Sequence, residues 1–412
     1  MLDAVVVGAG QAGLSASYWL GQRGLEHVVL ERGEVGESWR AQRWDSFVLN
    51  TPNALSTLPG DPYEGDDPEG FWTGGELRDR FRAYVRRFGL PVRERVTVAG
   101  VSAAPGGFAL RTDGDVIEAR NVVVASGMMQ VQKLPAAAAE VPPALASLHA
   151  SAYRHAAALP PGAVLVVGAA QSGCQIAEDL LAAGRRVYLA TSRVPRVPRR
   201  YRGRDFFAWL AAVGFWAERV EDLPDPAMKD ATQPQISGVG PRGHTISLQW
   251  LAERGVTLLG RFEGYRDGAL RFGGDAGANV RFADEASARM RGMVDARIAA
   301  LGIDAPPAEE DPADRPHPNP DAIDAPRSVE VARAGIGSVV WCTGFTARFP
   351  WLHVPEALDA AGQPVHTRGV SPVPGLYFAG FPWLTSRGSG LLLGVGGDAR
   401  AVVEHLAART SR

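Results

Sequence analysis

The stretch Val5-Val6-Val7-Gly8-Ala9-Gly10-Gln11-Ala12-Gly13 decides the fold of this chain. Its β-branched residues predict a buried strand and residues 14–24 a helix, so the glycines form a tight turn between them. In such a turn the middle glycine lets the backbone approach a pyrophosphate, and the last lets helix and strand pack closely. The next strand ends at Glu31, whose carboxylate can accept hydrogen bonds from ribose hydroxyls. The predicted dinucleotide-binding residues are Gly8, Gly10, Gln11, Ala12, Gly13 and Glu31.

The same order of elements recurs later in the chain. A strand is expected at residues 163–167, followed by the turn Gly168-Ala169-Ala170-Gln171-Ser172-Gly173 and a helix at residues 174–183. Alanine replaces the middle glycine, and its methyl group slightly crowds the approach of a pyrophosphate. The glutamine and the serine offer further phosphate donors. The predicted residues of this second site are Gly168, Ala170, Gln171, Ser172 and Gly173.

The residues after the next strand bear on which nucleotide the second site takes. Ser192 and Arg193 stand where an NAD-binding fold usually carries an acid. A hydroxyl and a guanidinium suit a 2′-phosphate, which favours NADPH over NADH. The alternative is that Arg193 belongs to a solvated basic run, which consists of Arg193, Arg196, Arg199 and Arg200.

Two strand–turn–helix units predict an α/β fold with two Rossmann-like dinucleotide-binding domains. Residues 122–127 and 339–344 are both apolar strands that end in a hydroxyl residue and glycine. We interpret them as the strands at which the chain leaves one domain or re-enters it, so that the stretch from Gly337 returns to the first domain. The expected domains are 1–157 with 335–412, and an inserted domain at 158–334.

The composition narrows the function. The chain has 412 residues, with 43 basic and 45 acidic side chains, and its net charge of −2 excludes nucleic-acid binding through bulk positive charge. No apolar run approaches the ~20 residues of a membrane span, and two cysteines cannot build a disulfide framework, so we expect a cytoplasmic protein. Cys174 and Cys342 are predicted to be small buried side chains, and no CxxC or metal-binding motif is present.

Residues 31–39, ERGEVGESW, resemble the FAD-binding domain of flavoproteins that have two dinucleotide sites. The resemblance implies FAD at the first turn, with contacts from Arg32, Ser38 and Trp39. The stretch His149-Ala150-Ser151-Ala152-Tyr153-Arg154 resembles the second half of the flavin-containing monooxygenase signature, whose first half is replaced here by Pro143 and Leu145. The alternative for this stretch is a linker whose His149 satisfies local backbone groups.

Two further segments resemble the same family. Residues 44–59 are similar to the segment beneath the flavin, which implies that the Asn50 amide hydrogen-bonds oxygen bound at flavin C4a; the alternative is a turn asparagine beside Pro52. Residues 375–399 are similar to the closing strand, flavin-facing loop and last helix, which implies a catalytic Arg387 and an FAD contact from Asp398. The chain thus resembles class B flavin-dependent monooxygenases, both bacterial and plant YUCCA-type.

This resemblance implies an NADPH- and FAD-dependent enzyme that inserts one atom of O₂ into an amine, a thioether or an α-keto acid through a C4a-peroxyflavin. Baeyer–Villiger enzymes, which oxidise ketones to esters, would show Trp-Pro where this chain has Tyr153-Arg154. The comparison with them therefore argues against ketone-to-ester oxidation. One alternative is an NAD(P)H:acceptor oxidoreductase or oxidase. Another is a redox-sensing flavoprotein that docks a partner on the aromatic helix expected at residues 205–220, although such a helix is more often core or a substrate channel. A homodimer is left open.

Overall fold

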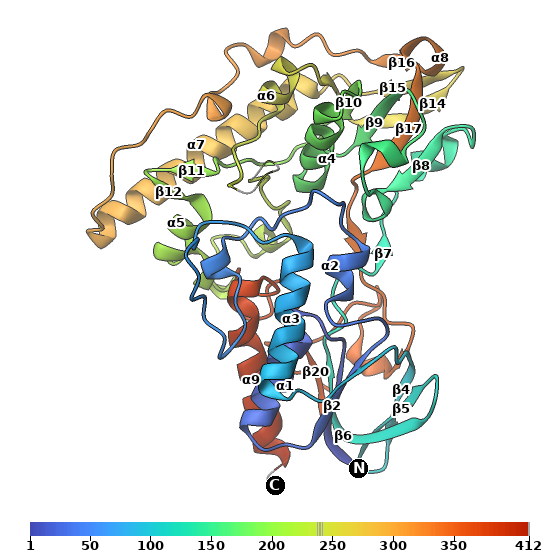
Figure 1. The fold of residues 1–412 in the computed structure, drawn as a ribbon, viewed down its shortest axis with the longest axis vertical. Coiled ribbons are helices and arrows are strands. Elements are labelled where there is room, and N and C mark those ends of the chain that lie inside the picture. The colour runs from blue at the N-terminus through green and yellow to red at the C-terminus, as the bar shows by residue number, and fades with distance from the viewer. Residues whose placement is uncertain (237, 239, 241, 411–412) are drawn as a thin grey trace.

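The computed structural model describes residues 1–236, 238, 240 and 242–410, which form two sheet-centred parts (Figure 1). The first part holds an eight-stranded sheet of order β19-β4-β5-β6-β1-β2-β3, with β20 also paired to β6. Its strands are β1 (Leu2–Val7), β2 (His27–Glu31), β3 (Val92–Glu94), β4 (Val98–Ala104), β5 (Gly107–Thr112), β6 (Val116–Val124), β19 (Leu352–His353) and β20 (Leu376–Phe378). Both chain termini lie at the end of this part that is remote from the second sheet.

The second part holds a five-stranded sheet of order β13-β10-β9-β17-β8, in which every pair is parallel. Its strands are β8 (Ala146–His149), β9 (Ala163–Val167), β10 (Val187–Ala190), β13 (Thr257–Leu259) and β17 (Ile336–Trp341). The central strand β9 is buried along its whole length, as expected for a parallel sheet that is covered on both faces.

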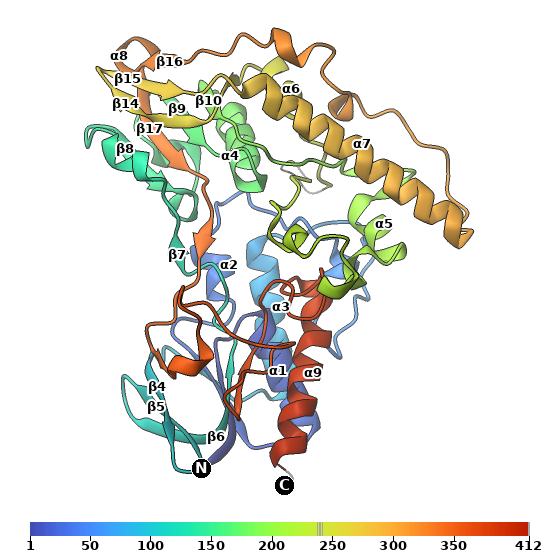
Figure 2. The ribbon, with the colours of Figure 1, turned by 180° about the vertical axis from the view of Figure 1, so that it is seen from behind.

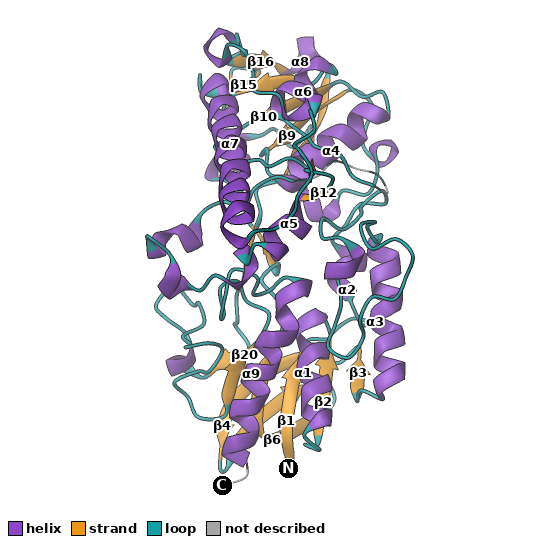
Figure 3. Ribbon diagram, turned by 90° about the vertical axis from the view of Figure 1, so that its left-hand side faces the viewer, coloured by secondary structure: helices purple, strands orange, loops and turns teal. Residues whose placement is uncertain are grey.

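Helices cover both sheets. In the first part α1 (Gln11–Gln22) and α9 (Leu392–Thr410) pack side by side over one face, and α3 (Gly74–Phe88) lies next to α1 (Figure 3). The indole Nε1 of Trp19 donates to the carbonyl of Gly396 at 3.0 Å, which ties α1 to α9. The remaining helices are α2 (Glu37–Ala41), α4 (Gln171–Ala182), α5 (Phe206–Ala212), α6 (Leu248–Glu253), α7 (Ala276–Leu301) and α8 (Val331–Ala334). No helix in the described ranges has the length and apolar character that a bilayer span requires.

Shorter strands complete the molecule. A three-stranded antiparallel sheet consists of β14 (Phe262–Arg266), β15 (Ala269–Phe272) and β16 (Ser328–Glu330), and β11 (Arg200–Tyr201) pairs with β12 (Arg204–Asp205). Between the two main sheets, β7 (Val131–Gln132) pairs antiparallel with β18 (Phe345–Thr346) (Figure 2). The backbone N–H of Lys133 donates to the carbonyl of Gly344 at 3.0 Å, so the two passages of the chain between the sheets run side by side.

The strand pairing corrects one expectation from the sequence. β17 pairs with β8 and β9, so residues 336–341 belong to the second sheet, and the predicted return to the first domain at Gly337 is wrong. β8 likewise lies in the second sheet although it precedes residue 158. An apolar strand followed by a hydroxyl residue and glycine occurs in both sheets here, and such a pattern does not specify which neighbours a strand pairs with. The division of the chain into two domains stays a prediction, with its crossing points moved to the β7/β18 pair.

Candidate active site

The two glycine turns share one backbone geometry. Gly8 has φ of +109° and Gly168 has φ of +104°, a region that residues with a side chain rarely adopt. A Cβ atom on Gly8 would lie 2.6 Å from the carbonyl oxygen of Ala125, and one on Gly168 would lie 2.5 Å from that of Cys342. In both sheets the turn therefore passes so close to the end of a neighbouring strand that only glycine fits.

The last glycine of each turn brings helix and strand together. A Cβ atom on Gly13 would lie 1.8 Å from the carbonyl oxygen of Gly8, and one on Gly173 would lie 1.8 Å from that of Gly168. No side chain could be accommodated at these distances. Both turns thus have the close packing that a dinucleotide-binding turn requires.

The middle position differs in sequence but not in conformation. Gly10 has φ of −84° and ψ of −172°, and Ala170 has φ of −78° and ψ of −171°, so alanine is unstrained there. A Cβ atom on Gly10 would meet no protein atom within 4 Å. Neither α1 nor α4 has a side-chain cap, which leaves the first amides of each helix open to a ligand. Both cradles fit the pyrophosphate of a dinucleotide.

The carboxylate of Glu31 lies against the first turn and stabilises it by accepting hydrogen bonds. Its carboxylate accepts from the backbone N–H of Ala9 at 2.8 Å and of Gly33 at 2.9 Å, and these bonds leave other lone pairs for ribose hydroxyls. Arg32 is exposed and has no side-chain partner within the ranges described. Ser38 and Trp39 lie half-buried on α2. Cζ of Arg43 lies 5.0 Å from the centroid of the Trp39 ring.

The C-terminal segments lie against the first turn. A Cβ atom on Gly380 would lie 2.4 Å from that of Ala12, and the side chain of Gln11 donates to the carbonyl of Gly390 at 2.8 Å. Asp398 is 2% exposed, and the hydroxyl of Thr385 donates to its Oδ1. Burial raises the pKa of Asp398, and its Oδ2 has no hydrogen-bond partner in the described protein. This buried open acceptor fits a ligand donor, as the prediction of an FAD contact requires.

Arg387 is engaged by protein groups. Its Nε and Nη2 donate to one carboxylate oxygen of Glu218 at 3.0 and 2.9 Å. Its Cζ lies 4.2 Å from the ring centroid of Phe215 and 4.7 Å from that of Trp383. The backbone N–H of Arg387 also donates to the carbonyl of Glu218 at 2.8 Å. These contacts fasten the loop before α9 to the segment after α5, and they favour an anchoring role over the predicted catalytic one.

Asn50 lies where the two parts of the molecule meet. Its Oδ1 accepts from the side-chain amide of Gln175 on α4 at 3.2 Å, and its backbone carbonyl accepts from Nη1 of Arg199 at 2.8 Å. The side-chain contact of Asn50 thus joins residues that are distant in the sequence, which argues against the alternative of a local turn asparagine. The residue is held by the helix that begins at the second glycine turn.

The second site has an exposed arginine, Arg193, beside it. Arg193 is exposed, and its Cζ lies 4.6 Å from the ring centroid of Phe282. Ser192 and Ser172 are half-buried. Oε1 of Gln171 accepts from the backbone N–H of Ile236 at 2.8 Å. The alternative of a solvated basic run is wrong for two of its members. Arg196 is buried against Asp284 and Asp314, and Arg199 is buried against Asp205.

The half-matched signature at residues 149–154 hydrogen-bonds the segments around the site. The hydroxyl of Tyr153 donates to Asp179 on α4 at 2.6 Å, and Arg154 donates to the carbonyl of Arg43 at 2.7 Å. Nε2 of His149 lies 3.0 Å from the carbonyl oxygen of Gly344, beside the chain crossing. These contacts favour the structural alternative for this stretch.

Several important residues were missed in the sequence. Gln175 is 1% exposed, and Arg199, Asp205 and Glu218 form the ion pairs described above. A polar amide on the apolar face of a predicted helix was the available signal for Gln175.

The aromatic segment at 205–220 is a short helix followed by a turn; its large rings Phe206, Phe207, Trp209 and Trp216 are buried, so it is core and not a docking surface. Cys174 and Cys342 are buried and free, as expected, and burial raises the pKa of the Cys174 thiol to about 12.

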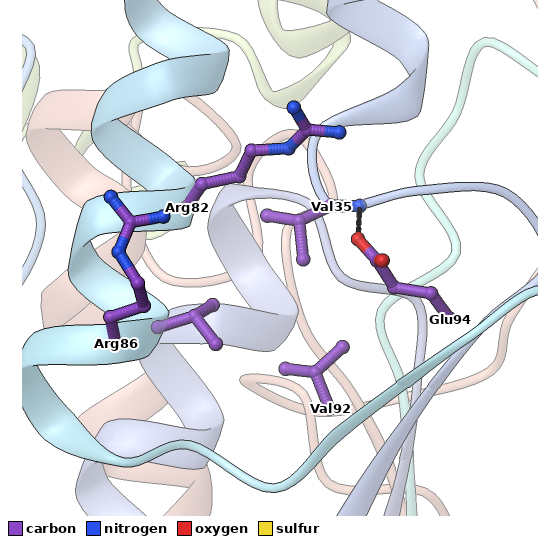
Figure 4. Close-up of a pocket in the computed structure, with 6 residues that line it drawn as sticks. Val35, Arg82, Arg86, Val92 and Glu94 are labelled. Carbon is purple, nitrogen blue, oxygen red and sulfur yellow. Dashed lines mark hydrogen bonds between the residues drawn. The ribbon is translucent and has the colours of Figure 1, made fainter.

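A cavity of about 460 Å³ lies between α3 and β3, beneath the loop that follows Glu31 (Figure 4). Val35, Val85 and Val92 form its apolar lining, and Arg82, Arg86 and Glu94 its polar lining. Glu94 accepts from the backbone N–H of Val35 at 2.7 Å. No predicted site residue lines this cavity. In the described part of the chain, no group of three or more His, Cys, Asp or Glu side chains is arranged to hold a metal ion.

Comparisons with known proteins agree with this architecture. The family model of the pyridine nucleotide-disulphide oxidoreductases matches residues 5–212. An uncharacterized oxidoreductase, CzcO, of Bacillus velezensis is 31% identical over 98% of this chain and 99% of its own length. Indole-3-pyruvate monooxygenase YUCCA1 of rice (Oryza sativa subsp. japonica) is 32% identical over 52% of this chain and 53% of its own. The structure of a flavin-containing monooxygenase from Stenotrophomonas maltophilia superimposes with a TM-score of 0.68 over 99% of both chains; at 20% identity this likeness shows the fold alone.

Proposed function

Because the chain belongs to the pyridine nucleotide-disulphide oxidoreductase family, as a class B flavin monooxygenase-like oxidoreductase, we propose that it is an NADPH- and FAD-dependent monooxygenase. The reaction consumes one NADPH, one proton and one O₂ per turnover, and yields water, NADP⁺ and a substrate with one added oxygen atom. With an α-keto acid the bond between the carbonyl and the carboxyl group breaks, so that the products are a carboxylic acid with one carbon fewer and CO₂. When bound, FAD supplies the chemistry of accepting hydride and activating oxygen. The proposed substrates are small amines, thioethers or α-keto acids.

The observation that carries this proposal is the bond between Asn50 and Gln175. Asn50 lies in the segment 44–59 that is expected beneath the flavin, and Gln175 lies about one turn into α4, which begins at Gln171. An enzyme that passes hydride from one dinucleotide to the other needs their reactive ends at a common boundary. The proposal assigns that boundary to these two residues.

The residues have separate roles. The first turn, Glu31 and Asp398 would hold FAD through backbone amides and two carboxylates. The second turn and Arg193 would hold NADPH, with the guanidinium on the 2′-phosphate. Asn50 would present its side-chain N–H groups to the flavin. The buried rings around residues 44–49 would exclude water from the reacting groups.

One relative supports a substrate class. The rice relative is named for indole-3-pyruvate, which is an α-keto acid, and its match covers about half of this chain. Among the three classes, α-keto acids are therefore the first to assay.

The second candidate is an NADPH oxidase or NADPH:acceptor oxidoreductase on the same fold, in which NADPH, a proton and O₂ give NADP⁺ and hydrogen peroxide. The observation in its favour is the half-matched signature, because its His149 and Arg154 are engaged in structural contacts. The redox-sensor alternative has lost its main support, since four of the five aromatic rings that were to form its docking surface are buried, and the fifth, Phe215, is half-buried.

The deciding experiment follows the fate of oxygen. The holoenzyme is supplied with NADPH, isotopically labelled dioxygen and each substrate class in turn, and NADPH loss, peroxide and labelled product are measured together. We expect labelled product, and peroxide below the amount of NADPH consumed, with at least one class. Peroxide equal to NADPH with every class would exclude the monooxygenase and favour the oxidase.

A further inference from the structure

We propose that Gln175 and Arg199 are positioning residues that fix the orientation of Asn50, and that this orientation sets the share of consumed O₂ that reaches substrate instead of leaving as peroxide. The inference rests on the proposed function. It concerns two residues that touch Asn50 from the second part of the molecule, one through the side chain and one through the backbone.

Gln175 determines which end of the Asn50 amide is available. Its Nε2 donates to Oδ1 of Asn50 at 3.2 Å, and a side-chain amide whose oxygen is bonded in this way must direct its NH₂ group elsewhere. No acceptor in the described ranges bonds that NH₂ group. Asn50 is therefore presented as a hydrogen-bond donor and not as an acceptor.

Gln175 also carries an open acceptor of its own. The residue is 1% exposed, and its Oε1 is buried with no partner in the described protein. Buried carbonyl oxygens are nearly always hydrogen-bonded, so this atom is open to a donor from a bound cofactor or an ordered water. The Asn50–Gln175 pair then has one open donor and one open acceptor.

Arg199 holds the backbone of Asn50. The guanidinium is fully buried; Nε donates to Asp205 at 2.6 Å and Nη1 to the Asn50 carbonyl at 2.8 Å. Its Cζ lies 4.1 Å from the ring centroid of Phe71. A planar guanidinium with donors in a fixed fork can satisfy the carboxylate and the carbonyl together, whereas a lysine ammonium cannot reproduce both contacts and the stacking.

A neighbouring ion pair offers a matched control. Arg200 pairs with Glu69 at 2.5 Å and also joins the two parts of the molecule, but it is 42% exposed at its side chain and does not touch Asn50. If Arg199 acted only as a link between the parts, Arg200 would share its effect.

The first test is a double-mutant cycle on the thermal unfolding midpoint of the purified protein, with Asn50→Ala, Gln175→Leu and the double variant. We expect the double variant to unfold close to the less stable single variant, because the second substitution removes a contact that is already lost. Fully additive shifts would overturn the proposed contact. This readout does not depend on turnover.

The second test measures the ratio of peroxide formed to oxygenated product formed in the holoenzyme. Gln175→Leu and Arg199→Lys should raise this ratio by about fivefold, the factor that corresponds to one lost hydrogen bond. Gln175→Leu should add nothing to Asn50→Ala, and Arg200→Lys should leave the ratio unchanged. A wild-type enzyme that oxygenates substrate while Gln175→Leu keeps its ratio would overturn this inference alone. Peroxide equal to NADPH in the wild type would instead overturn the proposed function.

Discussion

The Cζ atom of Arg193 lies 4.6 Å from the centroid of the Phe282 ring, and no carboxylate within the ranges described pairs with its guanidinium. The ring supports the cation from one side, while the exposed side chain keeps its N–H donors free. The neighbouring arginines Arg196 and Arg199 are buried in ion pairs and Arg200 pairs with Glu69, so Arg193 is the member of this run whose guanidinium is open to a phosphate.

Arg193→Ala should therefore raise KM for NADPH by about 10- to 100-fold, which corresponds to the loss of one or two charge-assisted hydrogen bonds. KM for NADH should change less than twofold. Arg281→Ala is the matched control, because Arg281 precedes Phe282 on α7 and pairs with Asp321 instead. Equal effects of Arg193→Ala on the two nucleotides in steady-state kinetics would remove its assigned role.

The glycine turns predict opposite outcomes for two Gly→Ala substitutions. In Gly173→Ala the new methyl group would lie 1.8 Å from the carbonyl oxygen of Gly168, so the unfolding free energy should fall by about 1–3 kcal/mol or more. In Gly10→Ala the methyl group meets no protein atom within 4 Å, so stability should be kept while the affinity for FAD falls. Denaturant unfolding and FAD titration of the apoprotein check the pair. A Gly10→Ala protein that unfolds as readily as Gly173→Ala would contradict this geometry.

Arg387 should behave as an anchor. Arg387→Ala and Glu218→Ala should each lower the unfolding free energy by about 1–3 kcal/mol, a range reduced for the partial exposure of the pair. The double variant should lose less stability than the sum of the two single variants, because both substitutions remove the same ion pair, while Glu218→Ala also breaks the pair with Arg297. Both substitutions should lower kcat to a similar extent. A loss of kcat in Arg387→Ala that far exceeds the loss in Glu218→Ala would restore the catalytic role.

His149 should make the protein less stable in mild acid. Burial lowers the pKa of His149 below its usual value of 6.5, against a smaller opposing effect of its hydrogen bond to Gly344. Nδ1 accepts from the backbone N–H of Ser151 at 3.2 Å, so a proton there would displace a native bond. As the pH falls, the unfolded chain takes up the proton first. The stability contribution that is present above pH 6.5 is therefore lost as the pH falls through the lower pKa of the folded protein.

His149→Gln should accordingly flatten the fall of the unfolding free energy between neutral pH and about pH 5. The measurement is denaturant unfolding at a series of pH values. The same slope in wild type and His149→Gln would show that other groups carry the pH dependence.

The local structure of the two cofactor turns could be read from the sequence because it depends on short-range geometry. A positive φ at Gly8 and the absence of a side chain at Gly13 are properties of residues five positions apart. The helix and the strand on either side follow from apolar periodicity over a few residues. The repetition of this unit at Gly168 also predicted two sheets.

The pairing of the strands could not be read in the same way. The strand at 336–341 has the same apolar pattern as β6, yet it pairs with β9 and β8 in the second sheet. A fully buried parallel strand is apolar on both faces, so its sequence carries no mark of its neighbours.

The sequence by itself determined that this chain has two dinucleotide turns on α/β units, because a glycine that must adopt positive φ or make a close approach has no substitute. Only the tertiary structure decided that Arg199 forms a buried ion pair with Asp205 and that Gln175 contacts Asn50. A run of arginines reads as a solvated surface until carboxylates from distant segments are folded onto it. The orientation of one asparagine amide depends on a donor 125 positions away, and that distance is closed only when the two sheets meet.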